Sequence, residues 1–194
     1  MENTDMENTD IAKYLYEMGY LKQVKRAGWG MLGIPQPESV AEHSFRTAIL
    51  GYILASLAGA DPERTATMCL FHDTAEARTG DLHRVARRYN NGNGEELALS
   101  EQVQRLPSAI ADGISSLVHE YEERSPIEGR LARDADLLEC ILQAREYQTQ
   151  GFADAEDWIS GCYASLQTEV AKSLADACLQ TEPKEWWQGL KVKR

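Results

Sequence analysis

Residues 69–81 read CLFHDTAEARTGD and place a histidine and an aspartate, His72 and Asp73, inside a helical run that is otherwise apolar. A charged group buried in a protein core is unfavourable by several kcal/mol unless a partner or a metal ion compensates it. Imidazole and carboxylate ligands together suit first-row metals such as Mn, Fe, Co, Ni and Zn. This stretch therefore predicts a helical protein that carries a divalent-cation site in its interior.

The pattern on either side of this stretch predicts an all-α fold. Ser39 and Glu42 fit the S-x-x-E capping box, in which each side chain satisfies a free backbone N–H at a helix start. Asp61 and Pro62 provide a cap and a first-turn proline for the next helix, and Gly80 ends it. Apolar spacing and breaks predict helices over residues 10–24, 40–60, 62–79, 95–105, 107–123, 127–150 and 154–179.

The same pattern of apolar spacing and breaks predicts the domain organisation. The repeated MENTD at residues 1–10 is polar and lacks a helical stripe, so we expect a flexible leader there. Residues 11–180 are expected to form a single helical domain, and residues 181–194 a C-terminal tail. No internal repeat of a domain and no linker is visible in the sequence.

Composition excludes several classes of function. The chain has 194 residues, a formal net charge of −11 and a pI near 4.8, which argues against binding to duplex nucleic acid. The longest uncharged stretch, residues 47–60, is too short to span a membrane, and no signal sequence is evident. The four cysteines form no C-x-x-C pair, so we expect reduced thiols and a cytoplasmic protein.

Further ligands for the cation must come from other helices. His43 lies in the first turn of the helix that the capping box begins. The stretch RLARDADLLECILQAREY adds Asp134 and Asp136, which lie about 200° apart around a helix, so only one of them can face the core. Periodicity alone leaves open which aspartate does so.

The order His43, His72-Asp73 and then an aspartate resembles the HD-domain metal-dependent phosphohydrolases. R-x-G-W at residues 26–29, PESVAEH at 37–43, H-D-x-A-E at 72–76, G-D-L at 80–82 and DADLLE at 134–139 are similar to the subgroup of bacterial 5′-deoxynucleotidases and their eukaryotic relatives. The resemblance covers roughly residues 12–150. It implies an all-helical phosphohydrolase that removes phosphate from nucleotide 5′-phosphates, with deoxyribonucleoside 5′-monophosphates the expected substrates.

The resemblance also implies roles for particular residues. One divalent cation per chain (Mn, Co, Mg, Fe, Ni or Zn) would be held by His43, His72, Asp73 and Asp136. The positions of Glu76 and Asp81 serve the attacking water or the leaving group in the family, and that of Trp29 lies against the sugar. Arg26, with Lys25 and Arg46 as lesser candidates, would neutralise the phosphate.

Other functions remain open at this point. The chain has Met31, Leu32 and Gly33 where bacterial relatives carry an arginine, so a modified nucleotide or one with a longer phosphate chain is an alternative substrate. A di-iron oxygenase would need extra histidines, and only His83 and His119 are available. A nucleotide sensor without turnover is the third possibility. Trp186 and Trp187 near the C-terminus, together with the behaviour of similar proteins, suggest a homodimer.

Overall fold

The computed structural model describes residues 2–90, 92–188 and 190, and over these residues the fold is all-α, as predicted. The only β-type pairing among them is an isolated antiparallel bridge between Lys25 and Ser39. No helix in the described part of the chain is both long and apolar enough to cross a membrane. The helices are α1 (Glu2–Tyr20), η1 (Ala27–Leu32), α2 (Val40–Ala58), α3 (Pro62–Phe71), α4 (Glu76–Thr79), α5 (Arg84–Arg87), α6 (Gly94–Val103), α7 (Ser108–Glu123), α8 (Ile127–Gln148), η2 (Ala153–Ala155), α9 (Glu156–Ser165), α10 (Glu169–Gln180) and α11 (Glu185–Gln188).

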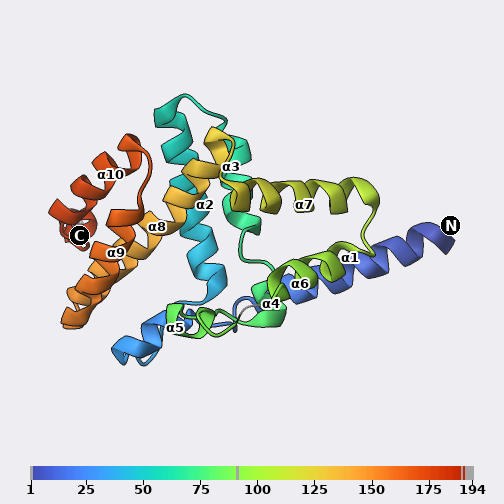
Figure 1. Ribbon diagram of the computed structural model, residues 1–194, viewed down its shortest axis with the longest axis horizontal. Coiled ribbons are helices and arrows are strands. Elements are labelled where there is room, and N and C mark those ends of the chain that lie inside the picture. Colours follow the sequence, from blue (N-terminus) through green and yellow to red (C-terminus); the bar gives the residue numbers. More distant parts are fainter. Residues whose placement is uncertain (1, 91, 189, 191–194) are drawn as a thin grey trace.

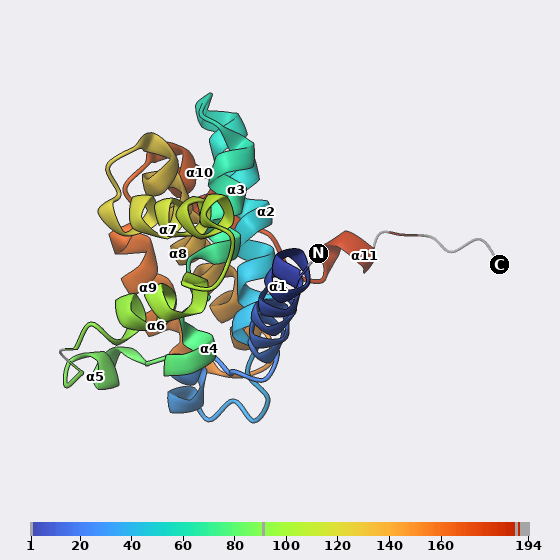
Figure 2. The same cartoon turned by 90° about the vertical axis from the view of Figure 1, so that its right-hand side faces the viewer.

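Helices α2 and α8 run through the centre of the molecule (Figure 1). Helices α9 and α10 lie on one side of this pair, and α7, α6 and α1 lie on the other. The main core is formed by α2, α3, α8, α9 and α10, and its fully buried members include Leu54, Met68, Leu131, Leu138 and Ile141. A smaller cluster, Tyr14, Val103, Leu106 and Ile114, joins α1 to α6 and α7. Helix α11 extends away from the body (Figure 2).

Local chemistry explains where the helices that carry the site begin and how closely they pack. The predicted capping box is confirmed, because Ser39 Oγ accepts the Glu42 N–H at 3.2 Å and Glu42 Oε2 accepts the Ser39 N–H at 2.6 Å. Gly51 lets α2 approach α3, since a Cβ at this position would lie 2.7 Å from Cys69 Sγ. This close approach places the start of α2 beside the end of α3.

The predicted helix over residues 62–79 is interrupted at His72–Ala75, so it forms α3 and α4 with a turn between them. His72 Nδ1 lies 2.7 Å from the Cys69 carbonyl oxygen, and Thr74 Oγ1 donates to the Phe71 carbonyl at 2.9 Å. Side chains that bond to nearby carbonyls compete with the helical pattern and favour a turn. The turn is what directs Asp73 away from the helix axis of α3.

Three other segments differ from the prediction. Residues 2–10 belong to α1, so the described part of the expected leader is helical, with Lys13 paired to Asp10 at 2.8 Å. A polar segment can extend a helix whose amphipathic part is already packed. The single helix predicted over 154–179 is two helices, α9 and α10, because the chain turns at Leu166–Thr168. The predicted tail includes the short helix α11.

Candidate metal and active site

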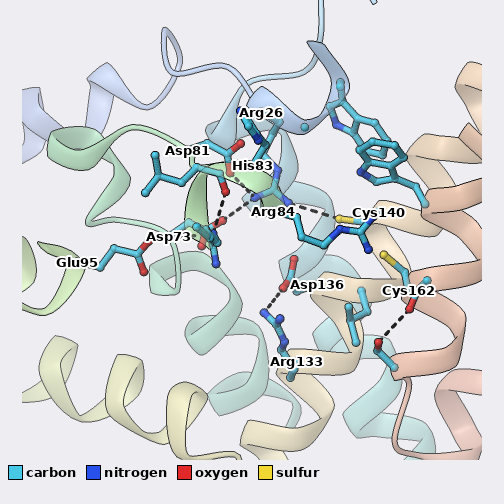
Figure 3. Close-up of a pocket in the computed structure, with 18 of the residues that line it drawn as sticks. Arg26, Asp73, Asp81, His83, Arg84, Glu95, Arg133, Asp136, Cys140 and Cys162 are labelled. Atoms are coloured by element: carbon cyan, nitrogen blue, oxygen red, sulfur yellow. Dashed lines mark hydrogen bonds and ion pairs between the residues drawn. The ribbon is translucent and has the colours of Figure 1, made fainter. Parts of the chain in front are cut away.

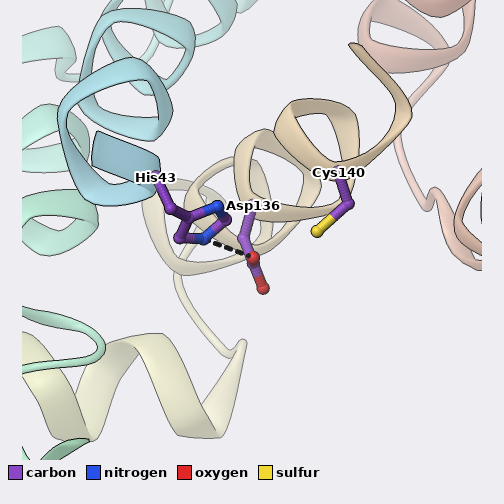
Figure 4. A group of neighbouring side chains, drawn as sticks. All are labelled: His43, Asp136 and Cys140. Atoms are coloured by element: carbon purple, nitrogen blue, oxygen red, sulfur yellow. Dashed lines mark ion pairs between the residues drawn. The ribbon is translucent and has the colours of Figure 1, made fainter. Parts of the chain in front are cut away.

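Three separated parts of the chain bring together the residues that the sequence suggested as metal ligands. His43 comes from the first turn of α2, His72 and Asp73 from the turn after α3, and Asp136 from α8. We call these four residues the His–Asp cluster. His43 Nε2 lies 3.1 Å from Asp136 Oδ1 and 3.9 Å from Asp73 Oδ2, and His72 Nε2 lies 3.1 Å from Asp73 Oδ2. Figure 4 shows how His43 and Asp136 face each other.

These separations suit a shared cation. The donor atoms of His43, His72 and Asp73 all lie within 4.8 Å of one another, and the same holds for His43, Asp136 and Cys140. Ligand atoms each about 2.1 Å from one ion lie no more than about 4 Å apart. The nitrogen–oxygen separations of 3.1 Å and 3.9 Å within the cluster are inside that limit. The donor set is two imidazoles and two carboxylates, with a thiol nearby, which is the mixed chemistry that first-row metals bind.

The orientation of His72 favours metal binding over a purely structural role. Its Nδ1 lies 2.7 Å from the Cys69 carbonyl oxygen, which fixes the proton on Nδ1 and leaves Nε2 with a free lone pair. His72 Nε2 is buried, and although Asp73 Oδ2 lies 3.1 Å away, Nε2 makes no hydrogen bond. A buried polar atom without a partner is unfavourable by about 1–3 kcal/mol, and a cation at this position removes that penalty.

His43 is oriented from behind by Glu139. His43 Nδ1 lies 2.6 Å from Glu139 Oε2, and Arg46 donates to Glu139 Oε1 from Nε at 3.0 Å and from Nη2 at 2.8 Å. Burial and Arg26 lower the pKa of His43, but Glu139 and Asp136 outweigh them and raise it to about 10. Without a metal, the proton on His43 therefore holds the ring against Asp136, and a metal must displace that proton.

The structure separates the two aspartates that periodicity left open. Asp136 faces the cluster, where Tyr121 Oη donates to its Oδ2 at 2.8 Å and Arg133 Nη1 donates at 2.7 Å. Burial raises the pKa of Asp136, but the hydrogen bond and charge of His43 hold it well below its usual range. Asp134 points the other way and accepts backbone N–H groups of Gln167 and Thr168.

The two predicted catalytic carboxylates lie beside the cluster. Glu76 begins α4 and is buried; its Oε1 lies 3.4 Å from Arg87 Nη2, and its Oε2 has no hydrogen-bond partner. Burial, followed by the charges of Asp73 and Asp81, raises the pKa of Glu76 to about 9. Asp81 follows Gly80 and accepts the backbone N–H of Ala27 at 2.5 Å through Oδ2.

A cavity of about 340 Å³ opens over the cluster (Figure 3). Arg26 projects into it, with Nη1 3.1 Å from Asp73 Oδ2 and 3.5 Å from Asp81 Oδ1, and Nη2 3.4 Å from Cys140 Sγ. Trp29 forms part of the wall, but it is only 2% exposed and its Nε1 donates to Glu38 Oε1 at 2.8 Å. Other basic residues around this cavity are Arg84, Arg87 and Arg133.

A second cavity of about 960 Å³ lies between α4, α6 and α7 and shares Asp73, Glu95 and Glu122 with the first. His72 and Glu76 line this second cavity, not the first. Asp136 lines the first cavity only. The His–Asp cluster therefore lies where the two cavities meet.

Two residues suggested for phosphate binding lie elsewhere. Arg46 pairs with Glu139, Gln143 and Glu146 behind His43, so its guanidinium holds Glu139 in place and does not line the cavity. Lys25 is exposed, and its charge acts on Glu42 at the start of α2. Helical position alone does not show on which side of His43 an arginine lies.

The remaining histidines do not join the cluster. His83 Nδ1 accepts the Ala86 N–H at 3.2 Å and caps α5, and His119 lies 3.0 Å from Glu123 on the surface of α7. The sequence analysis missed Tyr121, Arg133, Glu139 and Cys140 as neighbours of the site. Arg133 and Glu139 were detectable, since both lie three residues from Asp136 on one helix.

The fold and the His–Asp cluster define a class of helical proteins built around a histidine- and carboxylate-lined cation site. A family model described as HD domain matches residues 18–177, and the chain belongs to this family. The chain is 31% identical over 141 residues to the bovine (Bos taurus) 5′-deoxynucleotidase HDDC2. This alignment covers 72% of this chain and 68% of that protein. The chain is 29% identical over 196 residues to the Schizosaccharomyces pombe 5′-deoxynucleotidase hdd1, covering 97% and 98% of the two chains.

Among solved structures, a conserved hypothetical protein from Pyrococcus furiosus superposes with a TM-score of 0.74 at 28% identity, covering 88% of this chain and 99% of that one. The similarity therefore extends over nearly the whole fold described above.

Proposed function

We propose that this protein is a metal-dependent phosphohydrolase that removes phosphate from nucleotide 5′-phosphates, with deoxyribonucleoside 5′-monophosphates as its substrates. The proposal rests on the His–Asp cluster, in which the buried Nε2 of His72 lies 3.1 Å from Asp73 Oδ2 without making a hydrogen bond. Relatives named 5′-deoxynucleotidase at about 30% identity support the substrate class.

His43, His72, Asp73 and Asp136 would hold one divalent cation. Such an ion supplies a Lewis acid that polarises a phosphoryl oxygen and lowers the pKa of water toward about 7. The identity of the ion is drawn from Mn, Co, Mg, Fe, Ni and Zn, all of which accept nitrogen or oxygen donors.

The chain's own residues then bind the phosphate and move the proton. Arg26 presents two N–H groups to the cavity above Asp73, where a phosphate can accept them in place of Asp73 and Asp81. Glu76 holds a proton at neutral pH, because burial and two neighbouring carboxylates raise its pKa to about 9. It can give that proton to the leaving oxygen. Asp81 fixes the loop that carries Arg26 through the Ala27 N–H.

A panel of nucleotides and metals tests the proposal. Phosphate release is measured with each deoxyribonucleoside 5′-monophosphate, the matching ribonucleotides and the triphosphates, each with Mn²⁺, Co²⁺ and Mg²⁺. We expect release from the deoxynucleoside monophosphates in at least one metal. Phosphate release from triphosphates alone would favour a substrate with a longer phosphate chain. Absence of phosphate release with every nucleotide and metal would favour a nucleotide sensor without turnover.

The Glu76→Gln variant tests the role of Glu76. Turnover should fall at least about 100-fold while metal binding stays, since general acid–base groups contribute about 10²- to 10⁴-fold. Metal content by mass spectrometry and turnover are measured on the same preparation. Unchanged turnover would remove Glu76 from the mechanism.

We also propose that the protein is a cytoplasmic homodimer. Its four cysteines are free, which fits a reducing compartment. Trp186 is 75% exposed on α11, and Phe45, Tyr52 and Leu57 are 65%, 51% and 63% exposed along α2, which leaves apolar surface for a second copy. Light scattering coupled to size exclusion should give twice the chain mass, and a monomer mass would refute the dimer.

A further inference from the structure

Two cysteines from neighbouring helices lie together in the wall of the 340 Å³ cavity. Cys140 is on α8 and Cys162 is on α9, and both line the cavity. Figure 3 shows their sulfur atoms between the same two helices, and the two thiols are hydrogen-bonding partners. The proposed phosphohydrolase reaction uses neither thiol.

The surroundings of this pair differ from those of the other two cysteines. Cys162 is partly exposed to the cavity, and Cys140 is 9% exposed beneath it, with Sγ 3.4 Å from Arg26 Nη2. Cys69 is fully buried against the backbone of α8, and burial raises its pKa well above its usual value, which makes this thiol unreactive. Cys178 lies on α10 and does not line either cavity.

The hydrogen bond from Cys140 favours the thiolate of Cys162. It lowers the pKa of Cys162 and outweighs burial and the charge of Asp136, which raise that pKa, while Arg133 and Arg26 lower it further. Partly exposed thiols with a lowered pKa are the ones that peroxides oxidise, and a second thiol beside them resolves the product.

We propose that Cys140 and Cys162 form a peroxide-sensitive disulfide that switches the site off. The Cys162 thiolate attacks hydrogen peroxide, breaking the O–O bond, to give a sulfenic acid and hydroxide. The Cys140 thiol then attacks the Cys162 sulfur, which forms the S–S bond and releases water. Two thiols are oxidised and one peroxide is reduced to two waters.

The disulfide affects the site because Cys140 is part of its wall. Cys140 Sγ contacts Arg26 and lies within 4.8 Å of the donor atoms of His43 and Asp136. Drawing this sulfur toward Cys162 removes the contact that holds Arg26 Nη2, so Arg26 no longer presents both N–H groups over Asp73. The cluster itself keeps its ligands, since neither cysteine is one of the four.

Peptide mapping under non-reducing conditions tests the pairing without any need for activity. The full chain is treated with hydrogen peroxide and alkylated, and we expect a linked peptide pair containing Cys140 and Cys162, with two of the four thiols lost. The pair should disappear on treatment with dithiothreitol. Oxidation of Cys178 first, or of Cys162 to a sulfinic acid with no linked peptide, would overturn the proposal.

Turnover gives a second measurement that rests on the proposed function. In the wild-type enzyme, peroxide should lower phosphate release at least tenfold and dithiothreitol should restore it. Cys162→Ser should be insensitive to the same treatment, whereas the matched control Cys178→Ser should lose activity as the wild type does. A linked Cys140–Cys162 peptide without loss of turnover would refute the switch, and absence of any turnover in the reduced enzyme would refute the proposed function without affecting the mapping.

Discussion

Asp134 and Asp136 are buried carboxylates two residues apart on α8, yet their side chains contact different parts of the molecule. Asp136 faces His43, Tyr121 and Arg133 at the cavity. Asp134 faces the turn between α9 and α10 and accepts the N–H groups of Gln167 at 2.9 Å and Thr168 at 2.8 Å, together with the Thr168 hydroxyl at 2.6 Å. A separation of two positions along a helix is enough to point one carboxylate into the cavity and the other toward the turn between α9 and α10.

The contrast shows how a buried charge is compensated. The charge of Asp134 is compensated by two backbone N–H groups and the Thr168 hydroxyl, so loss of this carboxylate should lower the stability of the fold. The charge of Asp136 is compensated by His43, Tyr121, Arg133 and the proposed cation, so loss of this carboxylate should impair metal binding and turnover. The following experiments test this difference between the two residues.

Asp136→Asn should have the largest effect. The neutral amide keeps the shape of the side chain but loses the charge that holds a cation, so phosphate release should fall at least about 10³-fold. Metal content and turnover check this, with Asp134→Asn as the matched control. If Asp134→Asn lost the metal and Asp136→Asn kept it, the assignment of the two residues would be reversed.

Asp134→Ala should act on stability. Two buried N–H groups and a hydroxyl lose their acceptor, so the free energy of unfolding should fall by about 2–4 kcal/mol. For a chain of this size, Tm should fall by about 5–12 °C. Calorimetry measures the shift, and turnover at low temperature should stay within about twofold of the wild type. A normal Tm would mean that the α9–α10 turn holds without Asp134.

Glu139→Gln tests the support behind His43. The amide cannot carry the charge that pairs with His43 Nδ1 and Arg46, so metal affinity should fall about 10- to 100-fold. Titration calorimetry with Mn²⁺ or Co²⁺ measures it. Gln143→Ala is the control, because Gln143 also contacts Arg46 but not His43. Equal affinities in both variants would remove Glu139 from the support of the site.

Glu38→Gln should have a smaller effect, one that depends on pH. Burial and the charge of Glu139 raise the pKa of Glu38 to about 7, so the folded chain binds more protons than the unfolded chain between pH 4.5 and 7. Wild-type stability contributed by this group is therefore present at low pH and lost as the pH rises to 7. Relative to wild type, the variant should gain about 1–2 kcal/mol between pH 5 and pH 8. A difference in Tm that does not change with pH would contradict this.

Much of the fold followed from local signals. The capping box at Ser39 and the proline at Pro62 set helix starts that the structure reproduces. The split between α9 and α10 could not be predicted in this way, because the acceptor that stabilises the turn is Asp134, more than thirty residues earlier. The break after α3 depends on side-chain bonds from His72 and Thr74, which apolar spacing does not report.

Prediction of the site had similar limits. Residue types suggested His43, His72 and Asp73 and left Asp134 and Asp136 open. The family resemblance implied Asp136, and the structure brings the four residues of the His–Asp cluster together. The direction of a side chain was harder to predict. Arg46 has the charge expected of a phosphate ligand, but it lies behind His43, where Glu139 and Glu146 are its partners. Only the packing of α2 on α8 decides this.

Asp73, Glu95 and Glu122 line both cavities, and the smaller cavity combines four arginines with six carboxylates. Its arginines are Arg26, Arg84, Arg87 and Arg133, and its carboxylates are Asp73, Asp81, Glu95, Glu122, Asp136 and Asp157. An excess of carboxylates repels a nucleotide anion, and a bound divalent cation offsets that excess. The nucleotide should therefore bind after the cation, and its affinity for the cavity should depend on the metal concentration.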